Sequence, residues 1–327
     1  TTMLSIDKIN ALEFTTRMAK CQGCTNHCRL TINQFTGGRQ YISGNRCERG
    51  IGKEKNKHNV PNLYEYKLHR IFDYEPLPAD EAERGQVGIP RVLNMYENYP
   101  FWFTFFTQLK YQVVLSPLST HKIYELGIES IPSESECYPA KLAHGHVQWL
   151  INNGINTIFH PCVFYERQEN PNAQNHFNCP IVVSYAENLK NNVEAITEGD
   201  VHYIRPFIAF TSEKTAADRL VKTAAEEWNI PEQEVRSAVH KAWTEQLAAK
   251  EDIQTTGKKL LMNMEADGDR GIVLAGRPYH IDPEINHGIP ELIASYGLYV
   301  FTEDSLPADY EEPQSLRVVD QWVYHSR

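Results

Sequence analysis

The fold is decided by a succession of segments that reads PRVLNM (90–95), YPFWFTFFTQL (99–109), YQVVLS (111–116) and CYPAKLAHGHVQWLINN (137–153). The first and third are short apolar runs, which are typical of buried strands, and the second and fourth are long enough for helices. The pattern continues with NTIFHP (156–161) and CPIVVSY (179–185) as strands, AENLKNNVEAI (186–196) as a helix and VHYIRPFIAF (201–210) as a strand. Strands that alternate with helices predict the α/β class, with a doubly wound parallel sheet over residues 88–210.

The rest of the chain divides into four parts around this sheet. Residues 1–50 form a cysteine-rich module, and the polar stretch 51–87, which contains KEKNKHN, is expected to be a connector. Residues 211–268 carry apolar residues at three- and four-residue spacing, which predicts a helical bridge. Residues 269–327 begin a second α/β domain with GIVLAG, ELIASYG and LYVFT, and the chain then stops in VVDQWVYHSR without a helix cap. We therefore expect the second α/β unit to be incomplete and the natural protein to continue.

The composition is that of an ordinary globular protein of about two domains. The 327 residues are 41% hydrophobic and 23% charged, which provides for a sizeable core. A net charge of -10 without a Lys/Arg stripe argues against a nucleic-acid partner, and no apolar run is long enough to predict a membrane span. No targeting segment is recognised and the seven cysteines are odd in number, so a reducing cytoplasm is the expected location.

The first group of cysteines is Cys21, Cys24 and Cys28 in CQGCTNHC, followed by Cys47 in SGNRCERG. Four clustered thiolates are suited to a tetrahedral metal site, and the spacing leaves zinc and an iron–sulfur cluster both open. His27 could replace one thiolate, although a histidine in a turn is more often simply solvated. A disulfide framework is the alternative, and it needs an oxidising compartment.

The second group is Cys137, Cys162 and Cys179, which follow or precede predicted elements of the sheet. Ligands of doubly wound sheets collect beyond the carboxyl ends of the strands, where the loops with Cys137 and Cys162 are predicted to lie. Cys179 has to reach that edge through the loop that precedes CPIVVSY. Three thiolates at one edge predict a cluster site with an open position, and three unrelated buried cysteines are the alternative.

Polar residues beside these cysteines are candidates for chemistry. Lys141, His144 and His146 follow Cys137 on one predicted helix, where they could bind cluster sulfurs or a phosphate group, or transfer a proton. His146 could equally be a packed histidine. In GRPYHIDPEINHG, a metal triad of His280, Asp282 and His287 is one interpretation, with Arg277 nearby. The other interpretation is turn and cap chemistry around the two prolines.

Five segments carry a resemblance to a known family, and they are ENYPFWFTFFTQL, ESECYPAKLAHGHVQWLI, HPCVFYE, NHFNCPIVVSY and AGRPYHIDPEINHGIPEL. They resemble the domain DUF2229 of proteins related to the activators of 2-hydroxyacyl-CoA dehydratases, from Cys21 onward. The domain in turn looks like the iron–sulfur subunits of those dehydratases and of benzoyl-CoA reductases. The resemblance implies a [4Fe–4S] cluster, or a double-cubane cluster, held by Cys137, Cys162 and Cys179.

The same resemblance implies partners. An ATP-driven activator module, on the same polypeptide or in trans, delivers low-potential electrons in these systems, and the substrate is a small molecule or an acyl-CoA. The chain has no Gly-rich phosphate-binding loop of its own, so we expect it to be inactive alone. A homodimer is a further expectation, because an incomplete sheet leaves an exposed edge.

Two functions of different classes follow. The first is a reductase or dehydratase-like iron–sulfur protein whose open cluster passes electrons to a substrate. The second is a non-catalytic electron-transfer or scaffold domain that docks the activator, with structural zinc at the four N-terminal cysteines and no open site. Analysis of iron, sulfide and zinc after anaerobic purification separates them.

Overall fold

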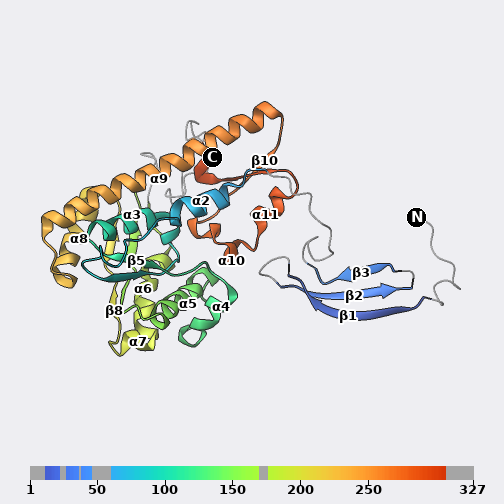
Figure 1. The fold of residues 1–327 in the computed structure, drawn as a ribbon, viewed down its shortest axis with the longest axis horizontal. Coiled ribbons are helices and arrows are strands. Elements are labelled where there is room, and N and C mark those ends of the chain that lie inside the picture. Colours follow the sequence, from blue (N-terminus) through green and yellow to red (C-terminus); the bar gives the residue numbers. More distant parts are fainter. Residues whose placement is uncertain (1–11, 23–26, 37, 46–59, 169–175, 307–327) are drawn as a thin grey trace.

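The computed structural model describes residues 12–22, 27–36, 38–45, 60–168 and 176–306 (Figure 1). A four-stranded parallel sheet has the order β5-β4-β6-β8, with β4 (Gln86–Ile89), β5 (Gln112–Leu115), β6 (Thr157–Phe159) and β8 (His202–Ile204). The chain leaves β4 to one side for β5 and later returns to its other side for β6. This order is that of a doubly wound sheet whose switch point lies between β4 and β6.

Two strands continue the sheet beyond prolines. β6 leads through His160 and Pro161 into β7 (Cys162–Tyr165), and β8 leads through Arg205 and Pro206 into β9 (Phe207–Ala209). β7 and β9 pair in parallel, with a register shift at Tyr165. A proline has no N–H for the ladder, so Pro161 separates β6 from β7 and Pro206 separates β8 from β9.

Helices cover both faces of the sheet. One face packs its apolar side chains, among them Val87, Phe159 and Ile208, against α3, α8 and α9. The other face, with Ile158 and Tyr203, packs against α5 and α6. Burial on both faces is what the near-continuous apolar character of the strands requires. The bounds of these helices are α3 (Met95–Gln108), α5 (Tyr138–Asn152), α6 (Pro180–Asn192), α8 (Glu213–Glu227) and α9 (Glu232–Asp267).

Local signals fix the helix ends. The hydroxyl of Ser212 accepts the Thr215 N–H at 3.1 Å and begins α8. α9 ends at Gly268, whose positive φ of 70° is the left-handed conformation common after helices. The short helices α4 (His121–Gly127) and α7 (Glu194–Thr197) complete this part, with the 3-10 turn η2 (Ile128–Ser130).

A second α/β unit is small. β10 (Gly271–Leu274) and β11 (Tyr299–Thr302) pair in parallel, and α10 (Pro283–Asn286) and α11 (Ile289–Ala294) lie between them in the chain, with the 3-10 turns η3 (Pro278–Ile281) and η4 (Glu303–Ser305). Asn62 forms a parallel bridge to Val300, just before α2 (Leu63–Phe72). The described part of this unit therefore has two strands and one bridge.

The N-terminal described residues form an antiparallel sheet of β1 (Phe14–Lys20), β2 (Arg29–Phe35) and β3 (Gln40–Ser43). It lies to one side of the rest of the chain in Figure 1. Its small core consists of Cys21, Leu30 and Ile32. The other two cysteines of the first group, Cys24 and Cys47, lie outside the described residues.

The predicted α/β class is confirmed, and five local predictions were wrong. Cys162, predicted to lie in a loop after the strand NTIFHP, is the first residue of strand β7. CPIVVSY is the start of helix α6 rather than a strand, and the first strand is QVGI (86–89) rather than PRVLNM. VHYIRPFIAF is split by Pro206 into β8 and β9. The predicted connector 51–87 contains helix α2, which Asn62 caps through its side chain. The helical bridge, in contrast, is present as α8 and α9.

Candidate functional site

Cys137 and Cys179 occupy equivalent places at the carboxyl edge of the main sheet. Cys137 is the N-cap of α5 and Cys179 is the N-cap of α6, and a proline follows in the first turn of each helix. Helices that return a chain between parallel strands begin at the carboxyl edge, so both thiols lie there. Proline at the first turn fits, because its missing N–H would be unpaired in any case.

The two thiols are close enough to influence one another. Burial raises the pKa of Cys137, and a charge on Cys179 adds to this effect. Both thiols also act on Tyr279 of η3, whose pKa is raised to about 12 by burial and then by the charge of Cys179. Cys137 is exposed and Cys179 is half-buried. The edge therefore presents a thiol pair with one tyrosine beside it.

Cys162 also follows the carboxyl end of a strand, β6, but unlike the other two inner cysteines its side chain is fully buried. It is fully buried at the start of β7, in the core formed with α5 and α6. Burial raises its pKa to about 12, helped by the charge of Glu187, and the Glu187 backbone N–H faces its sulfur. Such a thiol is protonated at neutral pH and unreactive as it stands.

Lys141 and His144 follow Cys137 on α5 and are both engaged. Lys141 Nζ donates to the Glu134 carbonyl at 2.6 Å, which ties down the loop before Cys137. His144 is buried, and its Nδ1 and Nε2 lie 2.7 Å from Ser130 Oγ and 3.0 Å from Tyr185 Oη. Burial lowers the pKa of His144 to about 4, so it is neutral at pH 7.

The hydrogen-bond partners fix the His144 tautomer. Ser130 Oγ donates its proton to the Gly127 carbonyl at 3.0 Å, so Nδ1 of His144 must be the donor to Ser130. Nε2 then accepts the hydroxyl proton of Tyr185. Tyr185 is buried and close to Cys137, whose charge contributes to raising its pKa. His144 thus fixes the position of the Tyr185 hydroxyl.

His146 belongs to a second, fully buried network. Its Nδ1 is 2.8 Å from Ser116 Oγ and its Nε2 is 2.9 Å from Ser119 Oγ. The Ser119 hydroxyl donates to Asp282 Oδ2, so Nε2 of His146 carries the proton and Nδ1 accepts from Ser116. Burial lowers the pKa of His146 to about 3, with Arg91 adding to the shift. Every polar atom of the imidazole has a partner.

The proposed triad of His280, Asp282 and His287 does not come together. Asp282 is fully buried and binds Ser119 and Tyr96, whereas His287 is exposed. His280 Nδ1 accepts the backbone N–H of Arg277 at 3.0 Å. Across the described ranges, no three His, Cys, Asp or Glu side chains form a group that could hold a metal ion, and this includes the three inner cysteines.

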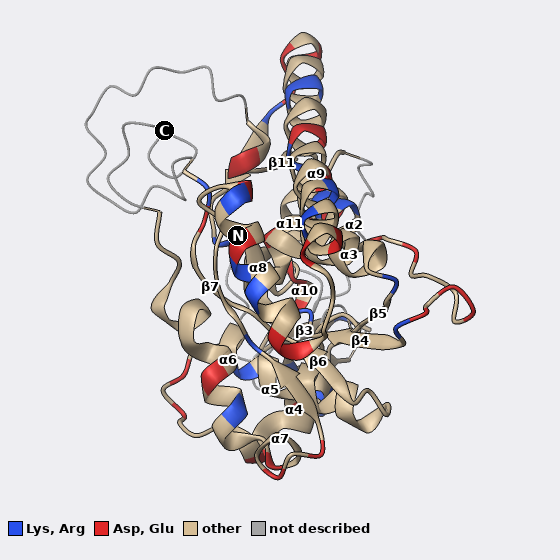
Figure 2. Cartoon of the chain, turned by 90° about the vertical axis from the view of Figure 1, so that its left-hand side faces the viewer, with Lys and Arg blue, Asp and Glu red and all other residues tan. Residues whose placement is uncertain are grey.

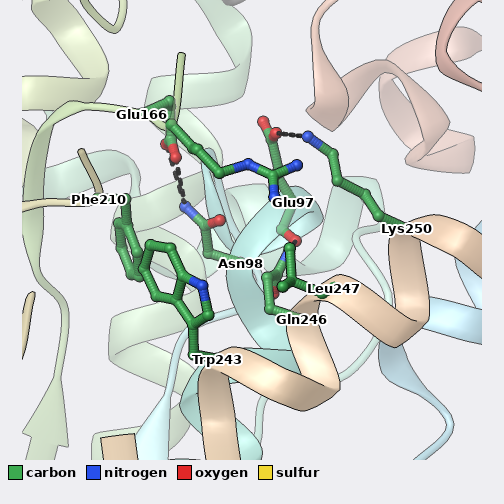
Figure 3. A pocket seen from close by; sticks show the side chains of 9 residues that line it. Glu97, Asn98, Glu166, Phe210, Trp243, Gln246, Leu247 and Lys250 are labelled. Atoms are coloured by element: carbon green, nitrogen blue, oxygen red, sulfur yellow. Dashed lines mark hydrogen bonds and ion pairs between the residues drawn. The ribbon is translucent and has the colours of Figure 1, made fainter. Parts of the chain in front are cut away.

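A separate pocket lies between α3, α9 and the residues that follow β7 and β9 (Figure 3). Glu166 follows β7, and its carboxylate accepts from Asn98 Nδ2 at 3.0 Å and from Asn178 Nδ2 at 2.7 Å. Burial raises the pKa of Glu166 to about 8, and the charge of Glu97 adds to it. Lys250 Nζ lies 3.7 Å from Glu97 Oε1. The cavity, about 30 Å³, has room for about one water molecule.

At the first cysteine group, two of the four residues are described. Cys21 and Cys28 lie on facing ends of β1 and β2, where the Cys21 N–H donates to the Cys28 carbonyl at 2.9 Å. β3 runs antiparallel to β2 and pairs Ser43 with Thr31, so the chain leaves β3 at the same end of the sheet. His27 Nδ1 is 3.2 Å from the Cys21 carbonyl.

Several residues of these sites were not identified from the sequence. Tyr185 and Tyr279 lie far along the chain from Cys137 and carry no motif, so only the fold brings them together. No sequence motif distinguishes Ser116, Ser119 and Tyr96 from other residues at strand ends and in helices. For Glu166, the loop position directly after a strand was the available signal.

Two further features of the helices bear on function, and they are the charge distribution on α9 and the apolar length of each helix. Lys and Arg alternate with Asp and Glu along α9, so the described part of this helix has no single-sign stripe (Figure 2). None of the helices in the described ranges combines the length and the apolar character needed to cross a bilayer.

Comparisons with known proteins identify the family. No curated protein and no solved structure matches the chain. The sequence family described as "CoA enzyme activase uncharacterised domain (DUF2229)" matches residues 86–306, which is more than half of the chain and includes both α/β units and the three inner cysteines. The chain therefore belongs to the DUF2229 family and has a role associated with CoA-related enzymes.

Proposed function

We propose that this chain is an iron–sulfur protein that passes low-potential electrons to a small or CoA-linked substrate. The observation that carries the proposal is the thiol pair: Cys137 and Cys179 are the N-caps of two helices that begin at the carboxyl edge of the main sheet. Helix N-termini favour negative charge, and an iron–sulfur cluster bound by thiolates is anionic. A [4Fe–4S] or a double-cubane cluster would supply the electron-transfer chemistry.

Two of the three inner cysteines are accessible enough to bind such a group. Cys137 and Cys179 have partly open sulfurs, whereas Cys162 is buried against α6 and its thiol has a strongly raised pKa. Cys162 becomes the third ligand in this proposal only if its side chain turns away from Glu187 and toward the edge. A cluster held by the other two thiols and one further donor is the simpler arrangement.

Residues around the thiol pair would then have distinct tasks. Lys141 fixes the loop that ends at Cys137, through its bond to Glu134. Neutral His144 accepts the only hydroxyl proton of Tyr185, so the Tyr185 oxygen would be held near Cys137 as a hydrogen-bond acceptor. His146 fixes the segment that follows β5 through Ser116 and Ser119. The electron source would be an ATP-dependent activator module, on the same polypeptide or in trans.

Metal analysis of cysteine variants tests the proposal. The protein and its Cys137→Ser, Cys179→Ser and Cys28→Ser variants are purified without oxygen, and iron and acid-labile sulfide are measured per chain. We expect the first two variants to lose most of the iron and sulfide, and Cys28→Ser to keep what the inner site binds. Full iron and sulfide in a Cys137→Ser/Cys179→Ser double variant contradicts the proposal.

A second candidate function rests on the N-terminal sheet. Cys21 and Cys28 face each other across a hairpin end, and β3 leads the chain back to that end before Cys47. This arrangement supports a metal bound by the four N-terminal cysteines, as zinc or as a second [4Fe–4S] cluster. If zinc is bound there and no iron is found in any preparation, the chain is instead a scaffold that docks the activator. The same analyses report zinc and decide between the two.

A further inference from the structure

A short segment of the second α/β unit lies across the thiol edge of the first. This segment, residues 276–286, is called the strap, and it comprises η3 and α10. η3 packs against α2 and α3, and Tyr279 contacts both hydrophobic cores. Glu284 of α10 accepts a hydrogen bond from the hydroxyl of Tyr138, the residue after Cys137, at 3.0 Å. The strap is thus attached next to the thiol pair.

Asp282 is the anchor of the strap. It is fully buried, and its Oδ2 accepts the hydroxyl protons of Tyr96 from α3 and of Ser119 from the loop after β5. Its Oδ1 accepts the Glu284 N–H at 2.8 Å, which caps α10. The Ser119 oxygen in turn accepts the Nε2 proton of His146, so each group in this chain donates toward Asp282. One carboxylate of the second unit therefore ends a hydrogen-bond chain that belongs to the first.

The closed strap also contains an unfavourable group. Glu284 is buried, and its Oε2 has no hydrogen-bond partner in the described residues. A buried carboxylate oxygen without a partner opposes the closed arrangement, and opening the strap would return it to water. The Asp282 bonds oppose that opening. The hydrogen bonds of Asp282 therefore stabilise the closed strap, and the unpaired Oε2 of Glu284 destabilises it.

We infer that the strap is a movable wall of the thiol site and that Asp282 is the positioning residue that keeps Tyr279 on the core surface that Cys179 also packs against. Cys137 is exposed with the strap closed, whereas Cys179 is half-buried, and both Cys179 and Tyr279 pack against the core formed with α5 and α6. A reagent that needs only Cys137 can therefore enter freely. A group that binds both thiols needs the strap to move. The inference concerns the thiol pair of the proposed function, but it holds for the protein without any metal.

Site-resolved alkylation of the reduced, metal-free protein tests this wall. Iodoacetamide labelling of each cysteine is followed by mass spectrometry in the wild type and in Asp282→Asn, Ser119→Ala and Asp252→Asn variants. Asp252 is the matched control, because it binds Tyr66 and Arg70 away from the strap. We expect the Cys179 rate to rise about tenfold in Asp282→Asn and a few-fold in Ser119→Ala, with Cys137 and Cys28 within about twofold.

The behaviour of Cys162 separates local release from general unfolding. Its rate should stay low in every variant, because it is buried against α6 and not under the strap. If Asp282→Asn does not fold, Ser119→Ala and Tyr138→Phe carry the test, since each removes one hydroxyl from the attachment. A Cys179 rate within about twofold of wild type in those two variants overturns the inference, and so does an equal rise at Cys162. Iron content is not a readout here, so this result and the proposed function can fail separately.

Discussion

Buried histidines at the thiol edge act as neutral hydrogen-bonding groups. His144 and His146 both have pKa values lowered by burial, to about 4 and about 3, and both rings are fully bonded. Their difference lies in their partners, because His144 reaches Tyr185 near Cys137 whereas His146 reaches Ser119 and Asp282. His144 therefore fixes a tyrosine of α6, and His146 fixes the serine that binds Asp282 of the strap.

Removing His146 tests how much the second network stabilises the protein. His146→Ala leaves a cavity and takes the partner away from two buried hydroxyls, so we expect the free energy of unfolding to fall by about 2–4 kcal/mol. Urea unfolding followed by circular dichroism measures it. His121→Ala is the control, because that side chain is 64% exposed on α4, and the loss should stay below about 0.5 kcal/mol. An equal loss in both variants would show that the network adds nothing.

Glu166 should make stability fall as the pH rises. Its pKa is about 8 in the folded protein, well above that of an unfolded glutamate, so the folded state holds the extra proton in this range. Between about pH 5 and 8 the wild type should lose up to about 1.4 kcal/mol per pH unit relative to Glu166→Gln. The histidines of lowered pKa act with the opposite sign, and they cancel in this comparison. Parallel pH profiles of the two proteins contradict the assignment.

At the scale of elements, the sequence predicts the long helices and most strands and fails where short signals compete. CPIVVSY is rich in β-branched residues, yet Pro180 in the first turn starts a helix, and a short apolar run alone does not distinguish the two. α2 was missed because KEKNKHN precedes it, although Leu63, Lys67 and Ile71 are buried at four-residue spacing. The alternation of elements predicted a loop that ends at a helix start for Cys137, whereas Cys162, also predicted in a loop, is the first residue of strand β7. The partners Tyr185, Tyr279 and Asp282 needed the fold.

The contact between α4 and α5 depends on a glycine. A Cβ on Gly145 would lie 1.8 Å from the Ile123 carbonyl oxygen, which is backbone and cannot turn away. Gly145→Ala should therefore destabilise the protein by about 2–3 kcal/mol, although alanine favours helices by about 1 kcal/mol. Thermal unfolding measures the change. Gly154→Ala is the comparison, because there a Cβ meets nothing within 4 Å and only the φ of +78° is strained. A more stable Gly145→Ala protein would contradict this packing.

At the scale of the whole molecule, two α/β units meet at one edge. The first supplies the thiol pair on the ends of α5 and α6, and the second supplies the strap that carries Tyr279 and Asp282. The family match spans both units, which agrees with a site that needs both. An activator that delivers electrons would approach this edge, because Cys137 is exposed there.

The central claim is that the thiol pair of the main sheet binds an iron–sulfur cluster. Diffraction from crystals of anaerobically purified protein, recorded at the iron absorption edge, locates iron directly. The account predicts an anomalous peak between the first turns of α5 and α6, within bonding distance of Cys137 and Cys179. A peak only beside Cys21 and Cys28, or no peak in crystals whose protein contains no iron, would contradict it.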